Sequence, residues 1–178
     1  MTERMTALGF KETDPKTLGF DPFTRIGDQW MLITAGDENG SNTMTASWGG
    51  AGIFCGKPAV VALIRKSRYT KGFVDGSDCF TLSFFPADKK QALVFCGSKS
   101  GRDFEKDEKA KKAGLTALYV DGTTAYEEAE LILVCRKMYS HDMNEDNFID
   151  KSIVESQYSD NDWHTAYVAE ITAAYVKR

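Results

Sequence analysis

The strongest constraint on the fold is a hairpin signal in the first quarter of the chain. Asp37-Glu38-Asn39-Gly40 reads as a turn and ends in Asn-Gly, the pair that favours a tight hairpin. A β-prone run, Gln29–Ala35, precedes the turn, and Ser41–Trp48 follows it. The sequence therefore predicts a β-hairpin with these two segments as its arms.

Extended segments recur along the rest of the chain. Pro58–Arg65 is rich in β-branched residues and predicts a buried strand. Further strands are predicted over Cys79–Phe85, Ala117–Val120, Ala129–Tyr139 and Trp163–Val176. Short helices are predicted over Ser67–Asp75 with Ser67 as N-cap, over Asp88–Cys96 and over Arg102–Ala113, and Asn144–Ser152 has a weak helical pattern. Residues 1–28, broken by two prolines and a glycine, form a lead-in.

This order of elements favours a mainly β fold. Strands outnumber helices and do not alternate regularly with them, so we expect a small β-barrel with short helices. The 178 residues contain no internal repeat or linker, and we expect one domain over residues 1–178.

Composition excludes several classes of protein. The net charge of −4 argues against general nucleic-acid binding. No apolar run approaches the roughly 18 residues of a membrane span, and the N-terminus has no apolar signal region, so we expect a cytoplasmic protein without membrane attachment. The four cysteines form no CxxC pair and lie far from the two histidines, so we expect reduced, mostly buried thiols and no metal site.

A polar, glycine-flanked stretch, Asn42–Gly50, is the first candidate for binding. Its hydroxyls and backbone N–H groups suit an extended edge that faces a ligand. A flavin ring needs donors near N5 and O4 and apolar cover on its faces. The backbone of Thr45, Ala46 and Ser47 could supply the polar contacts, and Met44 and Trp48 the cover. The alternative is a polar edge strand with a core tryptophan.

A basic cluster fifteen residues later is the second candidate. Arg65, Lys66, Arg68 and Lys71 lie within seven residues of an otherwise acidic chain, between a strand end and a helix start. Free backbone N–H groups and the helix dipole favour an anion there, and arginine adds bidentate geometry for phosphate. The cluster could equally be a solvated surface loop. Together, the two candidates predict a site for a planar cofactor that carries phosphate.

Other motifs are weaker. Gly50–Gly56 has the wrong spacing for a dinucleotide fingerprint, and Lys57-Pro58 follows where a helix should open. Ser98–Lys106 could place Arg102 near an anion or could be a solvated face. His164 is either structural or a hydrogen-bond donor to a flavin or nicotinamide, or a proton source near neutral pH.

The ordered set of motifs resembles the flavin reductase-like, flavoredoxin-type FMN-binding family. The set is Asn42-Thr-Met-Thr-Ala-Ser-Trp48, Ser67-Arg-Tyr-Thr70, Ser100-Gly-Arg-Asp103 and Trp163-His164, within roughly residues 20–176. The resemblance implies an FMN-binding split β-barrel, usually a homodimer with FMN near the subunit interface. It also implies a set of FMN contacts: Asn42, Thr43, Met44, Thr45, Ala46, Ser47 and Trp48 at the ring and ribityl chain, Leu63 and Arg65 at the ring edge, Ser67, Arg68, Tyr69 and Thr70 at the phosphate, and Ser100, Gly101 and Arg102 close by.

The resemblance leaves more than one function open. Many flavin reductases of the family carry Gly-Asp-His before the last strand, whereas this chain has Asp162-Trp163-His164, in which His164 is the matching residue and the candidate catalytic group. The leading hypothesis is an oxidoreductase that takes hydride from NADH or NADPH onto FMN and passes electrons to free flavin or another acceptor. The long polar segment Asn144–Asp160 is similar to the flavoredoxin-type branch. An FMN electron carrier reduced by a partner protein is therefore the alternative, and a β-barrel binding module without flavin is the third.

Overall fold

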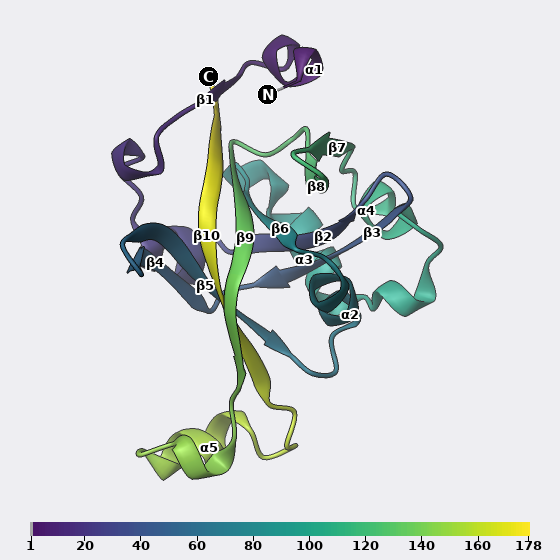
Figure 1. Cartoon of the computed structure of the whole chain (residues 1–178). Helices are drawn as coiled ribbons and strands as arrows, with labels where there is room; N and C mark the ends of the chain where they lie inside the picture. Colours follow the sequence, from purple (N-terminus) through teal and green to yellow (C-terminus); the bar gives the residue numbers. More distant parts are fainter. Residues whose placement is uncertain (1) are drawn as a thin grey trace.

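The computed structural model describes residues 2–178 and is built on one large antiparallel sheet (Figure 1). The sheet has eight strands in the order β3-β2-β6-β9-β10-β5-β4, with β1 paired to β10. The strands are β1 (Phe10–Glu12), β2 (Met31–Asp37), β3 (Gly40–Ala46), β4 (Gly49–Phe54), β5 (Lys57–Arg65), β6 (Cys79–Phe84), β9 (Leu131–Asp142) and β10 (His164–Lys177). β7 (Ala117–Val120) and β8 (Thr123–Tyr126) form a separate pair.

The predicted hairpin is confirmed. β2 and β3 pair from Met31 opposite Ala46 to Asp37 opposite Gly40, so the turn lies where the sequence places it. Within the turn, the Asn39 backbone N–H donates to Asp37 Oδ1 at 2.8 Å. A side-chain acceptor two residues back stabilises such a turn locally. β3 is the edge strand on one side of the sheet, so the predicted binding stretch begins on an edge strand.

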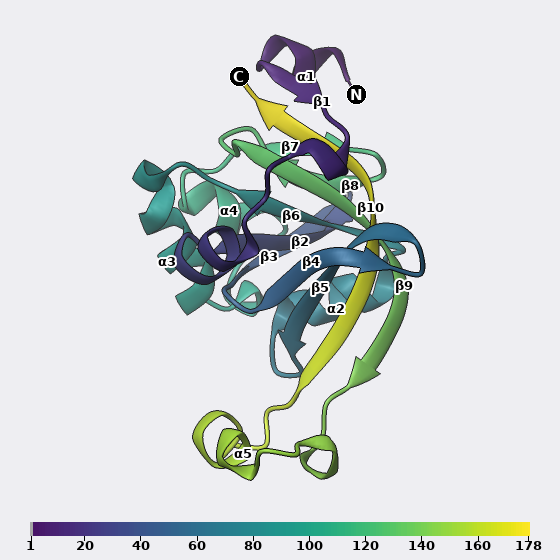
Figure 2. The same cartoon turned by 90° about the vertical axis from the view of Figure 1, so that its left-hand side faces the viewer.

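β9 and β10 form the central pair of the sheet. They are the longest strands, and β10 also pairs with β5 from Glu170 to His164. Figures 1 and 2 show the two strands running the length of the molecule, with the chain termini near one end and helix α5 (Lys151–Gln157) at the other. Because β10 pairs with Arg65 at its first residue, His164 is held beside the end of β5.

Both faces of the sheet are buried. Met31 and Ile33 belong to one hydrophobic core, while Leu32 between them belongs to the second. Side chains alternate between the faces of a strand, so β2 is covered on both sides. The second core lies beneath α3 (Lys90–Ser98) and the β7–β8 pair, since it contains residues of all three elements.

The helices are short and differ in part from the prediction. They are α1 (Glu3–Ala7), α2 (Tyr69–Gly76), α3, α4 (Glu108–Lys112) and α5, with helical turns at Pro15–Thr17, Phe23–Asp28, Ala87–Lys89, Gly101–Asp103 and Glu145–Asn147. The continuous helix predicted over Arg102–Ala113 is wrong. Lys106 has a φ of +37°, a left-handed conformation that no helix interior accepts, and it separates the turn at Gly101–Asp103 from α4.

Two other predictions need correction, and two strands were not predicted. Ser67 does not cap α2, because Arg68 holds that position and makes no side-chain capping bond. The lead-in is not merely a connection, since β1 within it pairs with β10. β4 and β8 were not predicted from the sequence. The mainly β class with short helices is confirmed.

Membrane spans, metal ligands and thiols were also compared over the residues that the structure describes. No helix is long and apolar enough to cross a bilayer. No cluster of histidine, cysteine and acidic side chains within residues 2–178 could hold a metal ion. All four cysteines are free, but only Cys96 and Cys135 are buried, so the expectation of mostly buried thiols holds for two of the four.

Candidate functional site

Two adjacent cavities lie between the β3 end, the β5 end and the helices. The first, of about 380 Å³, is lined by nearly all of the residues predicted for a flavin ring. These are Met44, Thr45, Ala46, Ser47, Trp48, Leu63 and Arg65, together with His164. The second cavity, of about 220 Å³, is lined by Ser67, Arg68, Tyr69, Thr70, Ser100, Gly101 and Arg102 among others. Met44 and Arg68 line both cavities, so the two join into one site.

Glycines let the backbone close around the first cavity. Gly49, which follows Trp48, has a φ of +150°, and a Cβ there would lie 2.4 Å from the Val61 carbonyl oxygen. The β3–β4 connection can therefore approach β5 only with glycine at this position. The opposite wall comes from α3, where Gly97 packs against Thr45. The Thr45 hydroxyl donates to the Leu93 carbonyl at 2.5 Å and so ties α3 to β3.

Two residues that were predicted to contact the cofactor lie outside both cavities and support their walls. Asn42 and Thr43 line neither cavity. The Thr70 hydroxyl donates to Asn42 Oδ1 at 2.8 Å in a buried pair. A Cβ on Gly101 would lie 2.1 Å from Asn42 Nδ2, so Gly101 must be small for this pair to form. The Thr43 hydroxyl bonds Thr34 at 2.9 Å inside the core and is turned away from the cavities.

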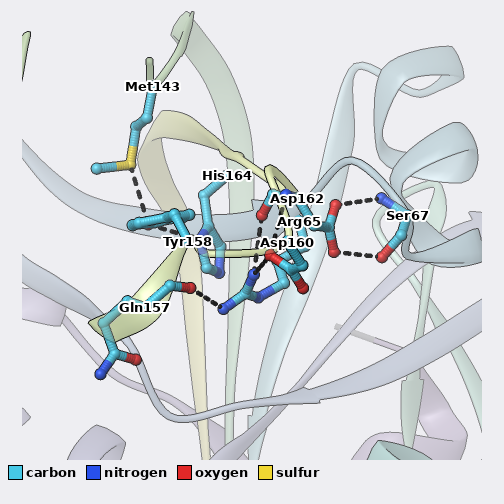
Figure 3. Close-up of polar contacts among 8 residues, drawn as sticks. All are labelled: Arg65, Ser67, Met143, Gln157, Tyr158, Asp160, Asp162 and His164. Atoms are coloured by element: carbon cyan, nitrogen blue, oxygen red, sulfur yellow. Dashed lines mark hydrogen bonds and ion pairs between the residues drawn. The ribbon is translucent and has the colours of Figure 1, made fainter. Parts of the chain in front are cut away.

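The expected phosphate position at Ser67 is taken by an internal carboxylate (Figure 3). The Ser67 backbone N–H and hydroxyl donate to Asp162 at 3.0 Å and 2.6 Å. Arg65 is similarly engaged, since its guanidinium donates to the carbonyl oxygens of Gln157 and Asp162, each at 2.9 Å. Both side chains therefore bind the segment that leads into β10, and their main donors are already used.

The remaining cations of the second cavity are differently placed. Arg68 is half-buried and donates to the Gly97 carbonyl at 3.0 Å. Lys109 of α4 is 3% exposed, and its only hydrogen-bond partner among residues 2–178 is the Thr43 carbonyl oxygen at 2.8 Å. Burial, with a smaller contribution from the Arg68 charge, lowers the pKa of Lys109 to about 8. A buried ammonium with unused donors is strongly disfavoured unless an anion pairs with it.

Arg102 contacts two other residues of the cavity wall. It donates to the Ser67 carbonyl at 3.1 Å, and its guanidinium carbon lies 5.2 Å from the centre of the Tyr69 ring. Tyr69 in turn packs edge-on against Phe73 at 5.4 Å. These contacts join the Gly101–Asp103 turn to α2.

His164 closes one side of the first cavity. Its Nδ1 lies 2.8 Å from the Tyr158 hydroxyl, and its ring centre lies 5.1 Å from that of Trp48. Burial and then the Arg65 charge lower the pKa of His164 to about 4, against the opposing effect of Asp162. The imidazole is therefore neutral at pH 7, which suits a hydrogen-bond donor and not a proton source near neutral pH.

Sequence reasoning did not assign several residues to the site, among them Ser98 and Lys99 of the second cavity. Trp30 and Gly97 line the first cavity, Lys109 lines the second, and Tyr158 contacts His164. Lys109 lies in a run of four lysines within seven residues, which resembles a solvated face. The usable signal was its position beside Ala110 and ahead of Leu115, which share a hydrophobic core. Trp30 has a φ of +71°, which only the structure could reveal.

A larger cavity of about 1280 Å³ borders α2 and shares Arg68, Tyr69 and Arg102 with the second cavity. Four of its charged side chains are paired with one another: Lys66 contacts Asp142 at 2.8 Å, and Lys71 contacts Asp75 at 2.7 Å. It contains neither His164 nor the Met44–Trp48 stretch. The smaller pair of cavities therefore offers the better binding chemistry.

The donors and walls of this site fit FMN. The first cavity has apolar and backbone walls for a planar ring, and the second presents the buried, incompletely bonded Lys109 beside Arg68 for a phosphate. Pockets that bind ligands of this size combine apolar walls with a few fixed polar groups in this way. The site thus combines an apolar, backbone-lined space with a cationic one, the two features that FMN requires.

Comparisons with known proteins agree with the fold. The chain is similar to an FMN-binding domain of a flavin reductases-like enzyme from Shewanella baltica (TM-score 0.65, 19% identity, 94% of this chain and 77% of that chain). It is also similar to flavoredoxin from Methanosarcina acetivorans, with a TM-score of 0.65 and 20% identity over 84% of this chain and 69% of that chain. A third similar structure is an NADH:FAD oxidoreductase from Streptomyces globisporus, with a TM-score of 0.61 and 14% identity over 82% of this chain and 74% of that chain. No curated protein sequence matches significantly. A family model described as the flavin reductase like domain matches residues 23–178, and the chain therefore belongs to the flavin reductase like domain family.

Proposed function

We propose that this protein binds FMN and acts as a flavin reductase-like oxidoreductase, with NADH or NADPH as hydride donor and free flavin or another molecule as electron acceptor. The observation that carries the proposal is the buried Lys109 ammonium, which has one acceptor among residues 2–178 and lines the second cavity, next to the first. The family membership supports the same cofactor.

Each part of the site has a distinct task in this proposal. Arg68 and Lys109 bind the phosphate, since charge-assisted bonds to phosphate are the strongest that the site can offer. The backbone of Thr45–Ser47 binds the polar edge of the ring, and Trp48 and Leu63 cover its faces. FMN supplies the two-electron redox chemistry when it is bound, while the protein orients it and limits access of water.

His164 donates a hydrogen bond to the bound ligand. Its low pKa keeps it neutral over the physiological range, so it binds a carbonyl oxygen without adding positive charge. Arg65 lies beside it, but its guanidinium is bound by the carbonyl oxygens of Gln157 and Asp162. We therefore assign Arg65 a supporting task and not a direct contact with the ring.

An FMN electron carrier reduced by a partner protein is the second candidate. His164 is only 7% exposed, because the segment that ends at Trp163 packs beside it. Such cover leaves little room for a nicotinamide ring next to the flavin. The flavoredoxin likeness is consistent with this alternative.

From its exposed apolar side chains and its free thiols, we also propose that the protein is a cytoplasmic homodimer. Several large apolar side chains are exposed, including Phe23, Ile53, Phe54 and Ile149. Exposed apolar groups of this size are common at subunit contacts. The four free cysteines suit a reducing compartment. A monomeric mass at micromolar concentration, measured by light scattering with FMN present, would contradict the dimer.

An anaerobic absorbance titration tests the main proposal. FMN is added to the protein, followed by NADH and then by NADPH. Bound flavin that bleaches with either nucleotide supports the reductase. Bound flavin that stays oxidised until dithionite is added supports the electron carrier. A flavin spectrum that never shifts in the presence of excess protein would refute both, and a β-barrel binding module without flavin would remain.

A further inference from the structure

Two acceptors of unequal strength surround the Tyr158 hydroxyl, and the difference between them favours one direction for its contact with His164. The Tyr158 hydroxyl lies 2.8 Å from His164 Nδ1 and 3.9 Å from Met143 Sδ (Figure 3). A thioether is a weak acceptor, whereas an imidazole nitrogen is a strong one. This difference favours a phenol proton that points to Nδ1, which then carries a lone pair. In the neutral ring the proton then resides on Nε2.

The phenol cannot easily leave this position. Tyr158 is 2% exposed, and its ring stacks on Trp163 with centres 4.6 Å apart and planes 15° apart. Phe148 contacts the same ring at 5.4 Å, and the Arg65 guanidinium carbon lies 5.3 Å from its centre. An aromatic ring enclosed on several sides keeps its hydroxyl at one point in space.

The surrounding charges select the same protonation state. Arg65 lies beside the imidazole and opposes a second positive charge there. The carboxylate of Asp162 is bound by two donors of Ser67, and Asp160 contacts Arg65 at 3.5 Å. The acidic group that acts on the ring, Asp162, and the acidic partner of Arg65, Asp160, are thus both paired elsewhere. Nε2 has no hydrogen-bond partner among residues 2–178, and His164 lines the first cavity.

We propose that Tyr158 is a positioning residue that holds His164 in its Nε2–H form, so that the cavity presents a fixed, neutral donor to a carbonyl oxygen of the bound ligand. The identity of that ligand as FMN rests on the proposed function. The tautomer itself does not, because it is a property of the protein alone. Tyr158 acts only through His164 and contacts no ligand.

Nitrogen NMR of protein labelled with ¹⁵N-histidine measures the tautomer directly. The chain has two histidines, and His141→Gln assigns the signals. At pH 7 we expect His164 with a protonated Nε2 and an unprotonated Nδ1. Tyr158→Phe keeps the ring packing and removes the hydroxyl, and we expect it to shift the tautomer ratio by roughly two- to tenfold towards Nδ1–H.

Two controls separate this effect from a general one. Tyr139→Phe removes another phenol hydroxyl beside a histidine, where the Tyr139 ring stacks on His141 at 6.4 Å. Met143→Leu removes the competing thioether acceptor. Both should leave the His164 tautomer unchanged. Circular dichroism confirms that each variant is folded before its spectrum is compared.

Three results would overturn the inference. One is a wild-type protein with Nδ1 protonated, another is a Tyr158→Phe variant with the wild-type ratio, and the third is a Met143→Leu variant that changes it. FMN is then added, and binding is followed separately by flavin absorbance. FMN that binds without moving the Nε2 signal refutes the donor role. FMN that does not bind at all refutes the proposed function and leaves the tautomer result standing.

Discussion

Substitution of Lys109 by methionine tests the phosphate site most sharply. The side chain is 3% exposed, and one of its three donors reaches the Thr43 carbonyl oxygen. The other donors are available to a phosphate. A hydrogen bond to a charged group contributes about 1.5–3 kcal/mol, which corresponds to a roughly ten- to hundredfold change in affinity. We therefore expect Lys109→Met to raise the FMN dissociation constant by that factor, measured by fluorescence quenching.

The pH dependence of the same affinity has a defined sign. Lys109 has a pKa of about 8 in the free protein, and a bound phosphate raises it. The charged form that binds phosphate therefore predominates below pH 8 and is lost as the pH rises through 8. We expect wild-type affinity to fall by about tenfold per pH unit above pH 8. Lys109→Met should lack this dependence.

Lys112→Met is the matched control, because it removes a lysine from the same helix. Lys112 is 55% exposed at its side chain and pairs with Glu108 at 3.0 Å. Its loss should leave FMN affinity and its pH dependence unchanged. If Lys109→Met binds FMN as tightly as the wild type, with the same pH profile, Lys109 does not bind the phosphate.

Three further predictions concern other parts of the site. Arg68→Ala should weaken FMN binding by about tenfold or more through loss of a charged donor, as fluorescence titration would show; an unchanged dissociation constant would remove Arg68 from the phosphate site. Any rate that depends on His164 should be flat between pH 5.5 and 8, because the pKa lies near 4, and a stopped-flow inflection near pH 6.5 would contradict this. Gly101→Ala should lower the melting temperature even without FMN, because its Cβ would lie 2.1 Å from Asn42 Nδ2. Gly72→Ala is the control, because a Cβ at Gly72 meets no atom within 4 Å, and it should not lower the melting temperature.

Most of the fold could be predicted from local sequence patterns. The Asn39-Gly40 turn and the β-branched run in Pro58–Arg65 specify strands through short-range chemistry, and both were found correctly. β4 was missed because Gly49–Phe54 contains three glycines and its pairing with β5 depends on a residue that can approach Val61 closely. The break at Lys106 was missed because helix propensity does not report a tertiary constraint on φ.

The candidate site was accessible in outline and not in detail. Most of the predicted residues do meet around two joined cavities. The sequence could not show that Asp162 binds Ser67, because the two positions are 95 residues apart. The only sequence signal that separates the buried Lys109 from its solvated neighbours is its position beside Ala110 and ahead of Leu115. Long-range pairing and burial decide these assignments, and neither is visible in a single sequence.

The position of His164 at the start of β10 has a consequence for local unfolding. β10 pairs with β1, β5 and β9, so its amides are expected to exchange with solvent only when the sheet itself opens. Helix α5 contributes no strand, and none of its residues is buried. Hydrogen exchange should therefore find slow amides in β10 and faster ones in α5, whereas Tyr158, buried against Phe148 and Trp163, should stay with the histidine that it contacts.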